Sequence, residues 1–437
     1  MMTPAAVHFI DQFSRRAASL PGSGLSWLAG LRRNAIERFA AVGLPTTRDE
    51  DWKYTSLRAL ENRTFDTLAP AQPLPLTPAA LADLVLPDAH VMVFVDGRWR
   101  PDLSYLGPLP AGTLLTHLGS LWAQPPEWLE PLLGAGGETA FEALNAAFMA
   151  DGACLRLPAG AVVTAPVQLL FITGSADLAV QPRNLIVAGE GSRACIVEHH
   201  VGLDGCRYLT NASTRIVAAA GARIEHVKLQ QESRAAAHIA AVHVTQGADS
   251  RLRSGSIALG GALARVGIAT ELDAEAAACE LAGLYIADGR QHTDHHTRVD
   301  HRRAGATSRE HYRGVMAGEA RAVFNGKVVV HRDAQRSDAF QANHNLLLSD
   351  RAEVDTKPEL EIYADDVKCG HGATIGQLDE DQVFYLRARG IDRAAARALL
   401  TLAFARDVID RIQTTSLRQR VERLVERRLP ALHGETT

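Results

Sequence analysis

Residues 221–248 read GARIEHVKLQQESRAAAHIAAVHVTQGA, in which short apolar or alternating runs lie between two Gly-Ala pairs. Similar pairs, a Gly or Asp followed by a small residue, recur between about residue 150 and residue 376. The recurring pairs are Gly160-Ala161, Gly191-Ser192, Gly221-Ala222, Gly247-Ala248, Asp273-Ala274 and Gly305-Ala306. Loose periods of this length are typical of stacked coils, because each turn passes its backbone hydrogen bonds to the next. The pattern favours a β-solenoid over 151–376, with an ordinary β-sandwich as the alternative.

The first 150 residues predict a mixed region rather than a part of the repeat. Apolar residues recur at helical spacing from residue 28, and Gly43 followed by Pro45 is a stop signal, so a helix is expected to end near residue 43. Residues 70–87 are rich in proline and are expected to form a linker. The run VMVFV at 91–95 followed by Asp96-Gly97 predicts a strand and a tight turn.

Residues 377–437 predict a helical domain. Asp392 is a suitable N-cap for a first helix with a broad apolar face, and a second helix is expected at about 416–429. A helical hairpin at the end of a solenoid is expected first to cap the last turn and second to offer a docking surface for a partner.

The composition limits the functional classes. The chain has 437 residues, 46 basic and 50 acidic side chains and a net charge of −4, so no broad electrostatic footprint for nucleic acid or an anionic membrane is present. Its five cysteines are scattered without a Cys-x-x-Cys pair, which suits a reducing compartment and predicts a cytoplasmic protein. The N-terminus lacks the pattern of a secretory signal, and the uncharged window 157–176 is interrupted by prolines and glycines, so no transmembrane helix is expected.

Ionisable residues are densest at 292–301, HTDHHTRVDH. On a strand, alternation places His292, Asp294 and His296 on one face and His295 and His301 on the other. Imidazoles and carboxylates in this density raise the alternative of a stand-alone metal-binding module. The favoured interpretation is a solvated outer face, with His295 and His301 hydrogen-bonded inside the solenoid, because one strand rarely supplies ligands that converge.

A second group lies in EIYADDVKCGHGATIG at 361–376. Cys369 and His371 are separated by one residue, so on a strand both side chains point to the same face. Sulfur and imidazole are suitable donors for soft or borderline metals, but two donors make an incomplete site. A functional role therefore requires further ligands from another chain, and the alternative is a buried thiol beside a structural histidine.

The sequence lacks the motifs of several hydrolases. No Gly-x-x-x-x-Gly-Lys-Ser/Thr phosphate loop is present, since the Gly326-Lys327 pair is followed by Val328. There is also no Gly-x-Ser-x-Gly elbow and no His-Glu-x-x-His helix. We therefore expect a protein that is not an enzyme, with a β-helix enzyme acting on carbohydrate as the enzymatic alternative.

Five segments that together reach across most of the chain carry a family resemblance: 49–55, 141–160, 292–301, 324–342 and 343–391. They resemble the SufB/SufD family, the iron-sulfur cluster assembly scaffolds of the SUF system. Two features favour the SufD branch. DEDWKYT at 49–55 fits the Glu/Asp-x-Trp-Lys-Tyr-Thr pattern, and CGHGATIGQLDEDQ at 369–382 has the Cys-x-His-Gly-Ala-Thr form, where SufB proteins show a Glu after the His.

The resemblance implies more than the residue patterns do. It implies a right-handed parallel β-helix core flanked by an N-terminal α/β region and a C-terminal α-helical domain. In such a SufBCD complex, the chain pairs with a SufB-like scaffold through the β-helix and binds a SufC-like ATPase through its C-terminal helices. His371 matches the family histidine that, with a SufB cysteine, is proposed to hold a nascent iron-sulfur cluster or iron at the interface. Cys369 is a weaker candidate ligand.

The same resemblance bears on cofactors and self-association. Thiolates and a carboxylate from the SufB-like chain would complete the soft ligand set that iron-sulfur clusters prefer. A reduced flavin has been associated with the complex, although this chain has no Rossmann-type glycine fingerprint. An exposed solenoid edge also allows the chain to pair with a second copy when it is alone, as a homodimer.

Overall fold

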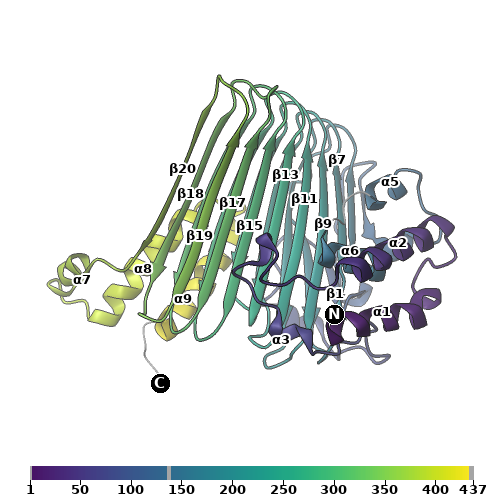
Figure 1. Cartoon of the computed structure of the whole chain (residues 1–437), viewed down its shortest axis with the longest axis horizontal. Helices are drawn as coiled ribbons and strands as arrows, with labels where there is room; N and C mark the ends of the chain where they lie inside the picture. Colours follow the sequence, from purple (N-terminus) through teal and green to yellow (C-terminus); the bar gives the residue numbers. More distant parts are fainter. Residues whose placement is uncertain (1, 135–138, 433–437) are drawn as a thin grey trace.

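The computed structural model describes residues 2–134 and 139–432. It shows a β-solenoid of about 8 turns, with helices before and after it (Figure 1). Strands hold 38 % of the residues and helices 26 %, so the fold is mainly β. The predicted solenoid is confirmed, and the alternative of a β-sandwich is wrong.

Two sheets of mostly parallel strands form the wall of the solenoid. From β8 to β20 successive strands alternate between the sheets, so each turn contributes one strand to each sheet. The first sheet contains, in spatial order, β2 (Arg98–Trp99), β1 (His90–Val95), β5 (Val167–Thr173), β8 (Arg193–Gly202), β10 (Arg223–Gln231), β12 (Arg251–Ala258), β14 (Ala278–Ala287), β16 (Thr307–Met316), β18 (Asp338–Leu347) and β20 (Lys368–Gly376). The second contains β19 (Glu353–Ile362), β17 (Arg321–Val330), β15 (His292–His301), β13 (Leu263–Leu272), β11 (Ala237–Gln246), β9 (Leu209–Ala218), β7 (Arg183–Ala188), β4 (Ala153–Leu157) and β3 (Leu114–His117), with β6 (Ala179–Val180) beside β9.

The turns are stacked in register. Arg251 of one turn lies opposite Ala278 of the next, and Thr307 lies opposite Asp338 in the same way. In-register parallel pairing places side chains of equivalent position above one another, so inward-facing residues form continuous rows along the interior.

The corners of the turns repeat at nearly even intervals. At these corners, residues with positive φ occur at positions 160, 191, 221, 249, 276, 305 and 336. Two of the predicted corner pairs are displaced from the observed corners. The left-handed residue is Asp249 where the sequence pattern predicted Gly247, and Ala276 where it predicted Asp273. Gly247 serves another purpose, because a Cβ there would lie 2.9 Å from the backbone nitrogen of Ala220. Its small size permits close approach of the neighbouring turn.

Three N-terminal helices, α1 (Pro4–Arg16), α2 (Ser26–Val42) and α6 (Ala140–Phe148), cover the beginning of the second sheet (Figure 1). The predicted helix ending near residue 43 is confirmed as α2, and the predicted strand at 91–95 is confirmed as β1. Asp96 and Gly97 both have positive φ, as the predicted tight turn requires. The remaining short helices of this region are η1 (Ala17–Ser19), η2 (Glu50–Trp52), α3 (Arg58–Glu61), η3 (Pro78–Leu81), η4 (Pro101–Leu103), α4 (Leu118–Leu121) and α5 (Leu129–Gly134).

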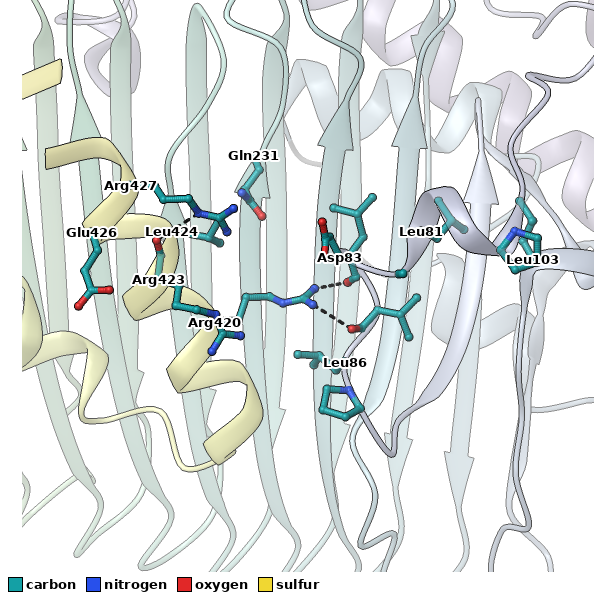
Figure 2. A pocket seen from close by; sticks show the side chains of 15 residues that line it. Leu81, Asp83, Leu86, Leu103, Gln231, Arg420, Arg423, Leu424, Glu426 and Arg427 are labelled. Carbon is teal, nitrogen blue, oxygen red and sulfur yellow. Dashed lines mark hydrogen bonds between the residues drawn. The ribbon is translucent and has the colours of Figure 1, made fainter. Parts of the chain in front are cut away.

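The proline-rich stretch 70–87 is a packed segment, and its prediction as a linker is wrong. Leu81 and Leu86 are each 2 % exposed, because the leucines between the prolines pack on the outer face of the first sheet. Arg420 of helix α9 (Thr415–Leu432) donates hydrogen bonds to the carbonyl oxygens of Leu84 and Val85 (Figure 2). The segment thereby joins the N-terminal region to the last helix of the chain.

The C-terminal helices are α7 (Glu380–Arg387), α8 (Arg393–Ile409) and α9. Asp392 caps α8 as predicted, since its side chain accepts a hydrogen bond of 2.9 Å from the backbone nitrogen of Ala395. In the part of the chain that the structure describes, these helices do not form the expected cap on the last turn. The apolar faces of α8 and α9 lie instead on outward-facing residues of the first sheet, because a row such as Leu229, Ile257 and Leu284 offers them a continuous apolar surface. None of the helices in the described ranges is long and apolar enough to cross a membrane.

We predict that Gly283→Ala destabilises the solenoid. A Cβ at this position would collide with the buried ring of Tyr312 on the next turn, so the ring has to move and the free energy of unfolding should fall by about 1–3 kcal/mol. Gly30→Ala in α2 is the matched control, because a Cβ there meets no atom within 4 Å and alanine favours the helix. Urea unfolding measures both variants, and equal midpoints for the two would contradict the packing argument.

Candidate functional site at the last turn

The strand β20 forms the edge of the first sheet and carries both predicted ligands. It is paired with β18, with Cys369 opposite Ala339 and His371 opposite Gln341. Ala339 and Gln341 are buried and face the interior, so Cys369 and His371 continue two inward-facing rows. The prediction that their side chains share one face is confirmed.

Cys369 and His371 differ in exposure. Cys369 is half-buried and packs against the apolar core of the solenoid, and this burial raises the pKa of its thiol. His371 is exposed, because no further turn covers its row. At neutral pH the site therefore presents an accessible imidazole beside a partly covered, protonated thiol.

A polar row extends from His371 into the solenoid. In-register pairing places Gln341 behind His371 and Glu310 behind Gln341, and both inner side chains are completely buried. Gly326 leaves room for the Gln341 amide, since a Cβ at that position would collide with it. Thr297 donates a hydrogen bond of 2.5 Å to Glu310, but burial dominates and raises the pKa of this carboxyl to about 7. The carboxyl group of Glu310, two turns behind the exposed imidazole of His371, therefore keeps its proton up to about neutral pH.

The surface around His371 combines free backbone groups with apolar side chains. Both β19 and β20 are edge strands, whose outer N–H and C=O groups can pair with another chain. Phe340, Ile362, Tyr363 and Ile375 on or beside the last strands are 43, 42, 59 and 48 % exposed, respectively. Large exposed apolar residues grouped at a sheet edge are typical of an interaction surface.

A second exposed apolar group lies on the C-terminal helices. Phe384 and Tyr385 of α7 are 70 % and 57 % exposed, and Leu399 of α8 is 49 % exposed. Figure 1 shows α7 projecting beyond the last turn, away from the sheets. The outer aromatic residues of α7 are therefore free to contact another protein.

The histidine-rich strand 292–301 alternates as predicted. His295 and His301 are inside the solenoid, where His295 lies 3.1 Å from the hydroxyl of Ser256 and His301 contacts two serine hydroxyls. The expectation of a solvated outer face is wrong for Asp294, which is completely buried. Thr55 of the DEDWKYT segment donates to its carboxylate, because this distant segment lies across the strand.

The strand 292–301 does not supply a cluster of potential metal ligands. Within the described ranges, the group of three or more convergent His, Cys, Asp or Glu side chains consists of His200, Glu232 and His238. Sequence analysis missed this group, because its members come from β8, from the loop after β10 and from β11. Only the three-dimensional stacking of the turns brings them together.

Comparison with known proteins agrees with this architecture. Residues 171–404 match the model of the SUF system FeS cluster assembly, SufBD core domain, and residues 4–169 match that of the SufBD protein N-terminal region. The chain belongs to the SufBD family. The boundary between the two matches falls within β5, so the SufBD N-terminal region includes β1 and β3 of the solenoid wall.

Several SufBD relatives resemble the chain over nearly its whole length. An iron-sulfur cluster assembly SufBD family protein of Synechocystis is 35 % identical, over 95 % of this chain and 94 % of the relative. The iron-sulfur cluster assembly protein SufD of Escherichia coli is 33 % identical, over 90 % of this chain and 92 % of its own length. The chloroplastic protein ABCI7 of Arabidopsis thaliana is 30 % identical, over 97 % and 90 %, respectively.

We predict that Glu310 makes stability fall as the pH rises. Between about pH 4.3, the pKa of a solvated glutamate, and pH 7 the folded chain keeps a proton that the unfolded chain has released. The free energy of unfolding should therefore decrease through this range and stay level above it. Relative to Glu310→Gln, the wild-type protein should lose about 2–3 kcal/mol between pH 4.5 and pH 8.

Urea unfolding at a series of pH values tests this prediction. Glu190→Gln is the matched control, because Glu190 is exposed at a corner of the solenoid. If wild type and Glu310→Gln lose stability in parallel over the whole range, the buried carboxyl is not the group that titrates.

Proposed function

We propose that the chain is a scaffold subunit, and not an enzyme, of an iron-sulfur cluster assembly complex. It would pair with a SufB-like scaffold through the last turn of the solenoid and hold a nascent cluster with His371 at their interface. The observation that carries the proposal is the exposed imidazole of His371 at the open end of the first sheet. Membership of the SufBD family supports an iron-sulfur cluster as the group that His371 would bind.

The open last turn supports pairing with another solenoid. The edges of β19 and β20 offer backbone hydrogen bonds, and the exposed residues Phe340, Ile362, Tyr363 and Ile375 offer apolar area beside them. A SufB-like chain with a similar edge could continue the sheets and cover this area. A second copy of the chain could use the same edge when the SufB-like chain is absent.

The ligand set supports assembly of a cluster between two chains. His371 and Cys369 provide one imidazole and one thiol, which are fewer donors than an iron-sulfur cluster requires. Cys369 is moreover held neutral by burial, so His371 is the principal ligand and the thiolates would come from the SufB-like chain. A reduced flavin in the complex stays a prediction.

The exposed aromatic residues of α7 support docking of a SufC-like ATPase. The chain has no phosphate loop of its own, so nucleotide hydrolysis requires a separate subunit. Phe384 and Tyr385 project from the helix that directly follows β20, and aromatic side chains of this kind are frequent anchors of protein interfaces.

We predict that His371→Ala leaves the fold and the complex intact but lowers the cluster yield at least about tenfold, because a direct ligand is lost. Bound iron and sulfide are measured after reconstitution of the purified complex with the SufB-like and SufC-like chains. His344→Ala is the matched control, since this histidine of β18 lies on the outer face and contacts Thr374. Equal yields from the two variants would make His371 a structural residue.

We predict that the double variant Phe384→Ala, Tyr385→Ala weakens binding of the SufC-like ATPase about tenfold or more while pairing with the SufB-like chain is retained. Titration calorimetry measures the first interaction, and size-exclusion chromatography follows the second. Tyr105→Ala is the control, because Tyr105 is 67 % exposed but lies in the N-terminal region. Unchanged ATPase affinity in the double variant would place the docking surface elsewhere.

A further inference from the structure

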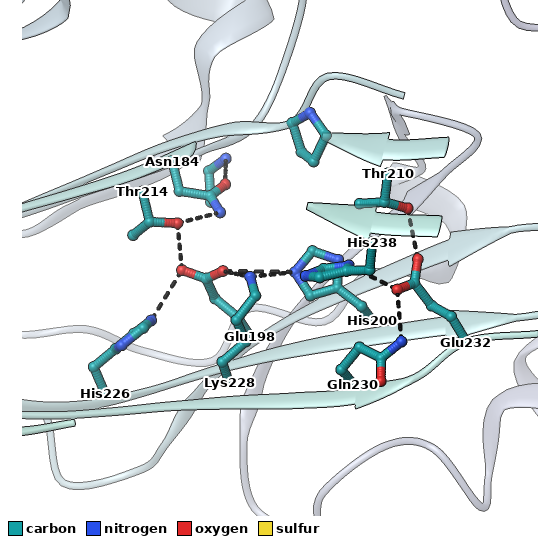
Figure 3. Close-up of polar contacts among 12 residues, drawn as sticks. Asn184, Glu198, His200, Thr210, Thr214, His226, Lys228, Gln230, Glu232 and His238 are labelled. Carbon is teal, nitrogen blue, oxygen red and sulfur yellow. Dashed lines mark hydrogen bonds and ion pairs between the residues drawn. The ribbon is translucent and has the colours of Figure 1, made fainter. Parts of the chain in front are cut away.

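Figure 3 shows a buried group of ionisable side chains inside the solenoid. The strand order places this group several turns away from His371. Every member is at most 4 % exposed. The group consists of the carboxylates Glu198 and Glu232, the ammonium of Lys228, and the imidazoles His200, His226 and His238. Charges buried to this extent require close partners, because removing them from water is costly.

One half of the group is electrically balanced. Glu198 accepts hydrogen bonds of 2.6 Å from Thr214 and 3.0 Å from the Lys228 ammonium, and Nε2 of His226 lies 3.0 Å away. Burial alone would raise the pKa of Glu198, but Lys228 and the two neighbouring histidines hold it well below its usual range. Lys228 is therefore the counter-ion of Glu198 and forms no ion pair with the second carboxylate among the described residues.

The second half lacks such a counter-ion. Glu232 accepts hydrogen bonds of 2.5 Å from Thr210 and 3.1 Å from Gln230, and within the described ranges it forms an ion pair with no lysine or arginine. Nδ1 of His238 lies 2.7 Å from Oε2 of Glu232, but this contact does not have the geometry of a hydrogen bond. Neither nitrogen of His238 has a hydrogen-bond partner among the described residues, although the ring is completely buried.

His200 completes the surroundings of Glu232 and His238. Its ring centre is 4.9 Å from that of His238, and the two rings are nearly perpendicular. The ammonium of Lys228 lies 3.1 Å from Nε2 of His200, and because an ammonium can only donate, this nitrogen accepts the hydrogen bond and the imidazole is neutral. Neutral imidazole is the form that binds metal ions.

We propose that His200, Glu232 and His238 form a binding site for one divalent cation of the zinc or ferrous type, separate from the cluster site at His371. One ligand atom from each residue lies within 4.8 Å of those of the others. Two imidazoles and one carboxylate are a donor set that such cations accept. Ligand atoms around a tetrahedral zinc ion lie roughly 3.3 Å apart, so small side-chain movements close the group around an ion.

The surroundings favour this assignment. Thr210 and Gln230 fix the carboxylate of Glu232, as second-layer hydrogen bonds do in metal sites. A bound cation would balance the charge of Glu232 and engage the imidazole of His238, whose nitrogens have no hydrogen-bond partner among the described residues. It would also connect β8, the loop after β10 and β11, and so tie two successive turns together through the interior.

Zinc is the probe, and the full-length chain is produced in medium supplemented with zinc and then dialysed against a chelator. Mass spectrometry of the elements should find about one zinc per wild-type chain and at least about tenfold less in His238→Gln. His226→Gln is the matched control and should retain the zinc, because His226 is an equally buried imidazole that contacts Glu198 instead. His371→Ala should also retain it, which separates this site from the proposed cluster site.

X-ray absorption at the zinc edge should show nitrogen and oxygen ligands without sulfur. Absence of zinc from the wild-type chain, equal zinc in His238→Gln, or a sulfur ligand would each overturn the proposal. If His238→Gln does not fold, Glu232→Gln replaces it, since the amide keeps the size of the side chain and can still accept from Thr210. Production in iron-supplemented medium without added zinc then tells whether ferrous ion occupies the same residues.

Discussion

In-register hydrogen bonding between successive turns is the constraint on which this structure depends. Each strand satisfies its neighbour's backbone groups, so the length of a turn is held nearly constant and the corner positions repeat. The same constraint leaves the outer groups of β19 and β20 without a neighbouring strand of this chain in the described ranges. A further strand can add only at an unpaired edge. The last turn, whose outer N–H and C=O groups are unpaired among the described residues, is therefore where another chain can extend the sheets.

The stacked rows also explain how one solenoid holds carboxylates in opposite protonation states. Glu198 and Glu310 are both completely buried on inward-facing rows of the first sheet. The first has Lys228 and histidines around it, which lower its pKa, whereas the second receives one hydroxyl from Thr297, so burial raises its pKa to about 7. The row fixes where each carboxyl group lies, and the polar and charged side chains of the neighbouring turns determine whether that group is ionised.

Local patterns predicted what depends on a single strand or helix. Alternation gave the faces of His295 and His301 and the shared face of Cys369 and His371, and capping chemistry gave Asp392 as the start of a helix. Contacts between distant segments could not be predicted in this way. Thr55 covers Asp294 across 239 positions of the chain, and His200, Glu232 and His238 converge only because three stacked segments meet. Periodicity indicates which face a side chain occupies, but the covering segment depends on the competition among all apolar surfaces.

The position of the C-terminal helices follows from that competition and has a consequence for the last turn. Helices α8 and α9 bury their apolar faces on the outer side of the first sheet, so the end of the solenoid stays accessible beside His371. Helix α7 lies in the chain between β20, which carries His371, and α8. Strand β20 ends at Gly376, and α7 begins at Glu380. Four residue steps of extended chain span at most about 14 Å. A protein bound to the aromatic residues of α7 therefore acts within a short chain distance of the strand that carries His371, while the packed α8 limits how far α7 can move.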